Sequence, residues 1–311
     1  MQGVMPSPDF AYHWHMCWLC DAKRLTSPSP AVEPDGASAR WQPRRGFLLA
    51  AAAGGATALL PGLAAAQVDV GSSSGLRKLV PAQQLESAAG QQYSQMLAEA
   101  RAKNALAPDN HPQLQRLRRI AQKLIPFAAP WNDRARQWQW EVNLIGSRQI
   151  NAFCMPGGKI AFYTGILDQL KLDDDEAAMI MGHEMAHALR EYARERVTKT
   201  QATSLGLALG AQLLGLGELG NVAANLGTQL LSLKFSRAGE SEADLVGLEL
   251  AARAGYNPQA SVSLWRKMGQ ATGGGGGGLE FLSTHPSGPQ RIEELQSNVP
   301  KVMGLYQQAR R

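Results

Sequence analysis

Cysteine is scarce in this chain, with three among its 311 residues. Cys17 and Cys20 lie close to His13 and His15, where a C-x-x-C pattern could bind a metal. We interpret that cluster as part of a leader that the mature protein lacks. Only Cys154 follows it, so the remaining chain cannot form an intramolecular disulfide, and a hydrophobic core must hold the fold.

The chain also lacks a strong charge of either sign, and it has no internal repeat. Its 31 Lys and Arg exceed its 26 Asp and Glu by five, and the basic residues are scattered rather than gathered in stripes. That distribution is typical of a solvated surface, so no nucleic-acid partner is expected. A length of 311 residues allows one large domain or two small ones.

The first 66 residues differ in composition from the rest. Arg44-Arg45 precedes an apolar, Ala-rich run that ends in small residues at Ala66, which are the three parts of a secretory signal of twin-arginine type. We expect cleavage near Ala66 and a periplasmic location, with a membrane anchor or a buried helix as the alternative. The expected organisation is a leader (1–66), a Ser/Gly-rich linker (67–80) and a single domain (81–311).

Hydrophobic periodicity predicts a mainly α-helical domain of α+β class with a small sheet. The expected helices span about 81–106, 112–125, 173–198, 238–254, 260–269 and 288–298, and the expected strands span 137–145, 150–154 and 159–164. Asp173 and Glu176 match a capping box at the start of the third helix. The apolar, Gly-rich segment 200–234 favours a buried helical hairpin, with membrane contact as the alternative.

The sequence His183-Glu184-Met185-Ala186-His187 is an H-E-x-x-H motif. Four residues turn an α-helix through about 400°, so both imidazoles lie on one face and can reach one Zn²⁺ at about 2.0–2.1 Å. Glu184 lies about 100° round the helix from His183, beside the open metal position, where it could act as a general base toward water. A pair of buried structural histidines is the alternative interpretation of this motif alone.

A catalytic zinc needs a third protein ligand, and the segment from Glu240 to Asp244 supplies the candidates. These two carboxylates share a helical face, whereas Glu242 lies about 200° round the helix from Glu240 and points elsewhere. We expect Glu240 to be the third ligand and Asp244 to accept the free N–H of a ligand histidine, which fixes its tautomer. Taken alone, this segment would be a solvated helix face.

His285 follows a run of six glycines and stands directly before a proline. A loop histidine near zinc could be a fourth ligand, a donor to the transition state or a capping residue, and the sequence leaves these alternatives open. His111 also precedes a proline, in a predicted turn, and we interpret it as a surface residue.

Four segments together resemble the HtpX and CAAX-prenyl-protease family of zinc metallopeptidases (metallopeptidase family forty-eight). They are Asn151-Ala152-Phe153 with Pro156-Gly157-Gly158, the motif His183–His187, Ser236-Arg237 through Glu240 to Asp244, and His285-Pro286 with Arg291. The resemblance covers roughly residues 110–298. It implies a gluzincin metalloprotease fold, helical with a small sheet beside the zinc-binding helix, and one Zn²⁺ per chain with Glu240 as its third ligand.

The resemblance also implies roles for other residues. The strand containing Asn151, Ala152 and Phe153 would border the cleft and pair with an extended substrate. His285 would reach the zinc and hold the enzyme inactive, as in periplasmic members of the family, and Arg291 would help to orient the site.

The chain departs from the family in two respects that matter for function. We expect no membrane-spanning helices after residue 66, and we do not expect the C-terminal repeat domain of the periplasmic BepA-like branch. A zinc-dependent endopeptidase acting on unfolded or misassembled envelope proteins is therefore expected, with peripheral membrane contact at most, and prenyl-peptide processing is not. The competing hypothesis is a zinc-containing periplasmic chaperone or binding protein with a closed or latent site.

Overall fold

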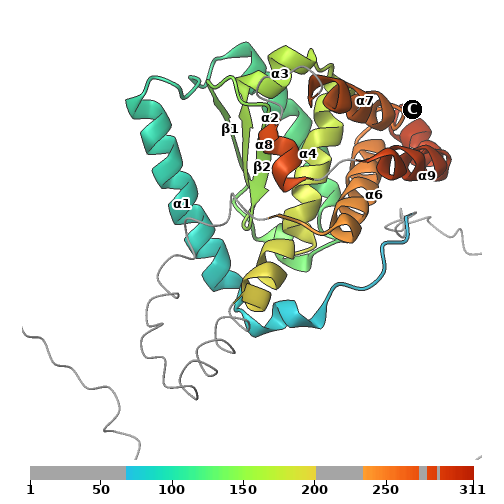
Figure 1. Cartoon of the computed structure of the whole chain (residues 1–311), viewed down its shortest axis with the longest axis horizontal. Helices are drawn as coiled ribbons and strands as arrows, with labels where there is room; N and C mark the ends of the chain where they lie inside the picture. The colour runs from blue at the N-terminus through green and yellow to red at the C-terminus, as the bar shows by residue number, and fades with distance from the viewer. Residues whose placement is uncertain (1–67, 201–233, 273–278, 286–287) are drawn as a thin grey trace, which may run out of the picture. The chain divides into compact units, whose positions relative to one another are not determined.

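The structure is a computed structural model and describes residues 68–200, 234–272, 279–285 and 288–311. All of them belong to one compact unit, Pro61–Arg311. The expected leader, most of the segment 200–234 and the six-glycine run lie outside these residues. In chain order (Figure 1) the elements are η1 (Gly75–Leu79), α1 (Ala82–Ala102), α2 (Pro112–Leu124), η2 (Ile125–Phe127), η3 (Asp133–Arg136), β1 (Glu141–Ile145), β2 (Ala152–Met155), β3 (Lys159–Tyr163), α3 (Thr164–Leu170), α4 (Asp174–Leu189), α6 (Arg237–Arg253), α7 (Ala260–Thr272), α8 (Leu279–Thr284) and α9 (Pro289–Ala309).

The three strands form one sheet in the order β1-β3-β2, which confirms the expected mainly helical α+β class with a small sheet. β1 runs parallel to β3, and β2 pairs antiparallel with β3 through a hairpin. Gly157 and Gly158 have φ values of 85° and 78° in that hairpin turn, a region that favours glycine. β2 is therefore an edge strand of the sheet that the structure describes.

β1 differs from the half-buried, alternating strand that the sequence predicts. It begins at Glu141 rather than at Gln137, and Val142–Ile145 are all buried. Both faces of the sheet are covered, so alternation between apolar and polar side chains is not required. The one polar residue in this stretch, Asn143, donates hydrogen bonds to Tyr93 and Glu141.

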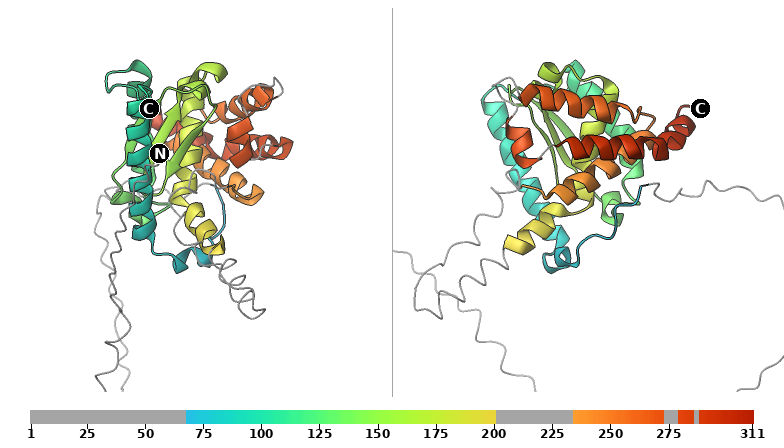
Figure 2. Two further views of the ribbon diagram at one scale, coloured as in Figure 1. Left: turned by 60° about the vertical axis from the view of Figure 1, so that its left-hand side comes forward. Right: turned by 45° about the vertical axis from the view of Figure 1, so that its right-hand side comes forward.

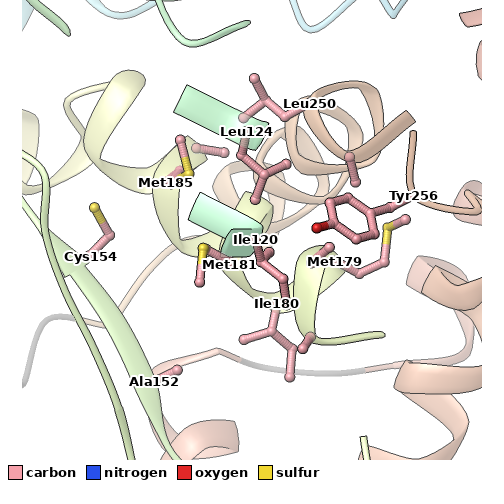
Figure 3. Packing of buried hydrophobic residues seen from close by; sticks show 14 of the residues in the cluster. Ile120, Leu124, Ala152, Cys154, Met179, Ile180, Met181, Met185, Leu250 and Tyr256 are labelled. Carbon is pink, nitrogen blue, oxygen red and sulfur yellow. The ribbon is translucent and has the colours of Figure 1, made fainter. Parts of the chain in front are cut away.

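The helices lie in layers on the two faces of the sheet. α1 packs on one face through a core that includes Tyr93 and Phe153. α2 and α4 cover the other face, and α6 packs on α4, followed by α7 and α9 (Figure 2). Figure 3 shows part of the core on this other face of the sheet, which we call the main core. There, Met185 of α4 lies between Cys154 of β2 and Leu124 of α2. The H-E-x-x-H motif therefore lies on α4, which packs between the sheet and α6.

α4 begins with the predicted capping box but ends earlier than predicted. Asp173 accepts from the Glu176 amide, and the Glu176 side chain accepts from the Asp173 amide. The helix ends at Leu189, and Glu191 adopts a left-handed φ of 57° before helical residues 192–200. The predicted continuous helix to 198 is thus wrong. The bend lets Arg190 donate to Glu242 on α6 at 2.7 Å.

α9 corrects a second boundary, since the sequence predicts an end near Asn298, just before Pro300. The helix continues through Pro300 to Ala309. Val302 and Leu305, beyond the proline, are buried in the main core. Tertiary packing against α6 therefore outweighs the hydrogen bond that proline removes.

The segment expected to be a linker, 67–80, packs on the domain where the structure describes it. Val68 and Val80 are buried, and the Val68 amide donates to Glu249 of α6 at 2.9 Å. Among the described helices, none combines the length and apolar character that a membrane span needs.

Candidate active site

α4 places both motif histidines on one face, as the helical spacing predicts. Their Nε2 atoms lie 3.1 Å apart, and both rings are buried. Glu240, on the first turn of α6, approaches both rings. Its Oε2 lies 3.5 Å from His183 Nε2, and its Oε1 lies 3.4 Å from His187 Nε2. Three ligand-type atoms from two helices therefore converge on one point.

His285, directly after α8, adds a fourth atom to this group. Its Nδ1 lies 3.4 Å from His183 Nε2 and 3.1 Å from Glu240 Oε1. Two ligands at about 2.0–2.1 Å from a tetrahedral metal are about 3.4 Å from each other. The four side chains, all buried, offer ligand atoms that lie within 4.8 Å of one another, so the residues present fit one metal ion with nitrogen and oxygen ligands.

Glu184 lies beside this group but is not part of it. Its Oε1 is 3.7 Å from His285 Nε2, beyond hydrogen-bond distance, and has no hydrogen-bond partner in the part of the chain that the structure describes. Burial raises the pKa of Glu184 above the ordinary carboxylate value. A buried carboxylate oxygen without a partner is costly for stability, which is typical of a group placed for chemistry.

A second carboxylate fixes the orientation of His183. Asp244, one helical turn after Glu240, lies with Oδ1 2.9 Å from His183 Nδ1. Arg291 of α9 donates from Nε and Nη2 to Asp244 at 2.7 and 2.8 Å, and its Nη1 lies 2.8 Å from Glu240. Arg291 therefore holds both acidic residues in place, whereas Glu242, as the helical wheel predicts, points away, toward Arg190.

The charges of the group follow from this arrangement. Burial alone would lower the pKa of His183, but hydrogen bonds to Asp244 and Glu240 raise it to about 9. Burial lowers the pKa of His187 well below its ordinary value. Burial opposes ionisation of Glu240, yet hydrogen bonds from His183 and His285 hold its pKa well below the usual range. A bound metal ion would therefore replace a proton on His183.

Asp244→Asn is expected to weaken zinc binding by about 10–100-fold, because an amide no longer fixes the Nδ1–H tautomer that leaves His183 Nε2 free for a metal. Competition with a chromophoric chelator measures the affinity. Asp109→Asn, which changes an exposed carboxylate paired with Arg118, is the matched control. Equal zinc affinity in the two variants would contradict the positioning role of Asp244.

Aromatic rings pack around the group, and sequence reasoning missed them. Phe235 stacks on His187 with ring centroids 4.0 Å apart, and Phe281 stacks on His285 at 4.4 Å. The Arg291 guanidinium lies 3.8 Å from the centroid of the Trp265 ring. No spacing rule marks these residues, because they come from a segment outside helices and from α7 and α8. Phe235 and Phe281 thus hold the imidazole rings of His187 and His285 by stacking.

A small cavity of about 50 Å³ lies between β2 and α4. Asn151, Ala152 and Phe153 line one side of it, and Glu184, His187 and His285 line the other. The structure therefore brings the candidate residues of the resemblance to one place, with the edge strand β2 along the cleft, whereas Cys17 and Cys20 lie outside the described residues.

A helix that carries H-E-x-x-H, a Glu from a second helix and a small sheet beside them are the features of the gluzincin class of metallopeptidases. The chain belongs to peptidase family M48, whose family model matches residues 112–299, more than half of the sequence.

Named relatives support the same family. Mitochondrial metalloendopeptidase OMA1 of Schizosaccharomyces pombe is 35% identical over 198 residues, which are 63% of this chain and 56% of that protein. OMA1 of Saccharomyces cerevisiae is 32% identical over 215 residues, 66% of this chain and 61% of that protein. Metalloprotease LoiP of Escherichia coli is 26% identical over 213 residues, 66% of this chain and 78% of that protein. The chain thus spans less than two thirds of either OMA1 protein.

The expected periplasmic location is wrong. Relatives between 32% and 38% identical to the chain are named as mitochondrial metalloendopeptidases. The Arg44-Arg45 pattern misleads because Arg-rich leaders are not specific to one compartment and also occur in mitochondrial transit peptides. The envelope setting expected for the substrates depended on that location.

Proposed function

We propose that this protein is a zinc-dependent endopeptidase, with residues 81–311 as one peptidase domain. His183, His187 and Glu240 would hold the zinc, and Glu184 would act as the general base. The observation that carries the proposal is the set of ligand-atom separations, between 3.1 and 3.5 Å, next to a buried Glu184 oxygen that has no hydrogen-bond partner in the described chain.

The chemistry needs an electrophile and a base. A zinc ion bound here would act as a Lewis acid toward the scissile carbonyl and would make water acidic. Glu184 takes the proton of the attacking water and delivers a proton to the leaving amine. Asp244 and Arg291 keep His183 and Glu240 in position.

The substrate is proposed to be an extended, unfolded or misassembled polypeptide. β2 is an edge strand whose residues line the cleft with Glu184. An extended peptide that adds to such an edge is held by backbone hydrogen bonds, which every sequence can form. Folded proteins cannot present such a segment, so the cleft would select unfolded chains.

His285 supports a second candidate function, a zinc-containing binding protein or chaperone with a closed site. Structural zinc sites use four protein ligands, whereas catalytic sites keep one position open. The four ligand-type atoms here would fill a tetrahedron if His285 were bound. An intact Glu184 favours a peptidase, because a structural site needs no base.

His285→Ala distinguishes the two candidates. We expect this variant to cleave casein at least about ten times faster than the parent, because removal of the imidazole opens the fourth metal position. Zinc content, measured on each sample, should remain near one per chain. His111→Ala, which removes the histidine that caps α2, is the control and should behave as the parent. A parent and a His285→Ala variant that both hold zinc and cleave nothing would favour the binding protein.

A further inference from the structure

Two leucines are exposed on η1, the short helix that precedes α1. Leu76 and Leu79, on η1, expose 44% and 72% of their surface, and they are the large hydrophobic residues that stand out as exposed in the described part of the chain. The side chains of Arg77 and Lys78 lie between them in sequence. Exposed apolar residues interleaved with basic ones are typical of segments that lie at a membrane interface.

η1 is fixed against helical residues 192–200. Arg77 pairs with Glu191 at 3.5 Å, and the Arg194 guanidinium donates to the Val80 carbonyl. Val80 and Val197 belong to one buried cluster. η1 is therefore held at a fixed place on the domain, and its light-blue ribbon lies at the lower edge of the described part of the chain in Figure 1.

Exposed basic residues lie on η1, on helical residues 192–200 and directly before α6. Lys78, Arg196 and Lys234 are exposed and form no ion pair with the residues that the structure describes. Lys199 is also exposed and pairs with Glu195 at 2.5 Å. A hollow of about 310 Å³ lies between Ser72–Ser74 on one side and Arg196, Lys199 and Lys234 on the other; Lys234 stands shortly before α6.

The acidic residues of this face are neutralised. Glu191 pairs with Arg77 and Arg194, and Glu242 pairs with Arg190. Among the described residues, these carboxylates are all paired, whereas Lys78, Arg196 and Lys234 are not, so an excess of positive charge remains.

We propose that the face formed by η1 and helical residues 192–200 docks on an anionic lipid surface. Two leucines give too little area for a protein partner, since a stable interface buries about 1,200 Å² or more. A lipid surface needs no fitted partner, and each basic residue close to anionic headgroups strengthens binding about fivefold. The basic side chains would contact lipid phosphates while Leu76 and Leu79 enter the acyl boundary.

Docking would also orient the active site. Phe235 lines both the hollow and the cavity that contains Glu184. The cleft would then face polypeptides that emerge from, or lie on, the lipid surface. Only this consequence rests on the proposed peptidase function; docking itself does not depend on catalysis.

Vesicle co-sedimentation of the full chain tests the proposal. We expect binding to phosphatidylcholine vesicles that contain phosphatidylglycerol, weak binding to phosphatidylcholine alone, and loss of binding in high salt. Leu76→Ser with Leu79→Ser should weaken partition at least about tenfold, and Lys78→Glu several-fold. Lys103→Glu, an exposed lysine after α1, should change little. Glu184→Gln should bind as the parent, which separates docking from peptidase activity.

A labelled chain locates the contact directly. Leu79→Cys, in a chain with Cys17 and Cys20 replaced by Ser, carries an environment-sensitive dye, while Cys154 is buried. Its emission should shift to the blue with anionic vesicles, and the same dye at Gln308→Cys should not shift. The proposal would be overturned if the parent did not bind anionic vesicles. It would also be overturned if the double Leu variant bound them as well as the parent and the dye at position 79 showed no blue shift. Self-association without lipid that the double Leu variant abolishes would assign the face to a second copy instead.

Discussion

Replacement of Glu184 by Gln is expected to lower the rate of casein cleavage by about a thousandfold, within the 10²–10⁴-fold range that general-base catalysis contributes. Gln keeps the shape of the side chain but cannot accept a proton at neutral pH. Glu184 stands outside the four ligand-type residues, so zinc content should remain near one per chain. The residue therefore separates catalysis from metal binding.

The measurement pairs digestion kinetics with zinc analysis on the same samples. To raise the signal, the substitution is made both in the parent and in the His285→Ala background. Glu99→Gln, which removes an exposed charge on α1, is the matched control and should cleave like its parent. If Glu184→Gln cleaved at the parental rate with zinc bound, another group would be the base and the proposed mechanism would fail.

The sequence predicts which polar side chains come together better than it predicts the helix boundaries, and the reason is physical. Helical spacing alone decides that His183 and His187 share a face, that Glu240 and Asp244 share another, and that Glu242 points away. Each of these expectations needs only that its own helix forms. The structure places the residues accordingly, with Asp244 2.9 Å from His183 and Glu242 paired with Arg190.

Boundaries that depend on distant contacts were predicted less well. The break in the helix at Glu191 has no Gly or Pro to predict it. The turn is instead held by hydrogen bonds from Arg190 and Arg194 to carbonyl groups of the distant segment 70–80. Conversely, Pro300 suggests an end that packing on α6 overrides. Likewise, the stacking of Phe281 on His285 depends on where α8 packs, which no local pattern specifies. Local rules therefore determine which candidate ligands share a helical face, and tertiary contacts determine which side chains surround them.

The crossing of α4 and α6 explains why the ligands from two helices meet so closely. Gly182, next to His183, and Gly247, one turn after Asp244, face each other where the helices cross. A Cβ at Gly247 would lie 2.6 Å from the His183 amide nitrogen and 2.8 Å from the Gly182 carbonyl carbon. Both are backbone atoms, so no side-chain rotation could relieve the clash. The spacing between the two helices thus requires glycine at both positions.

Gly247→Ala is therefore expected to lower the free energy of unfolding by about 2–3 kcal/mol, because overpacking outweighs the gain in helix propensity of about 1 kcal/mol. The substitution should also weaken zinc binding, since α6 can accept the methyl group only by moving Glu240 and Asp244 away from His183. Urea unfolding, analysed at constant m, measures the first effect, and chelator competition measures the second.

Gly304→Ala in α9 is the matched control for this substitution. Nothing lies within 4 Å of a Cβ built at Gly304, so the same change should stabilise the protein by about 0.5–1 kcal/mol through reduced backbone entropy. If Gly247→Ala lowers the free energy of unfolding and Gly304→Ala raises it, the destabilisation comes from the close crossing of α4 and α6 and not from replacing glycine by alanine in a helix. A Gly247→Ala variant that is as stable as the parent and holds zinc as tightly would show that the crossing does not set the ligand geometry.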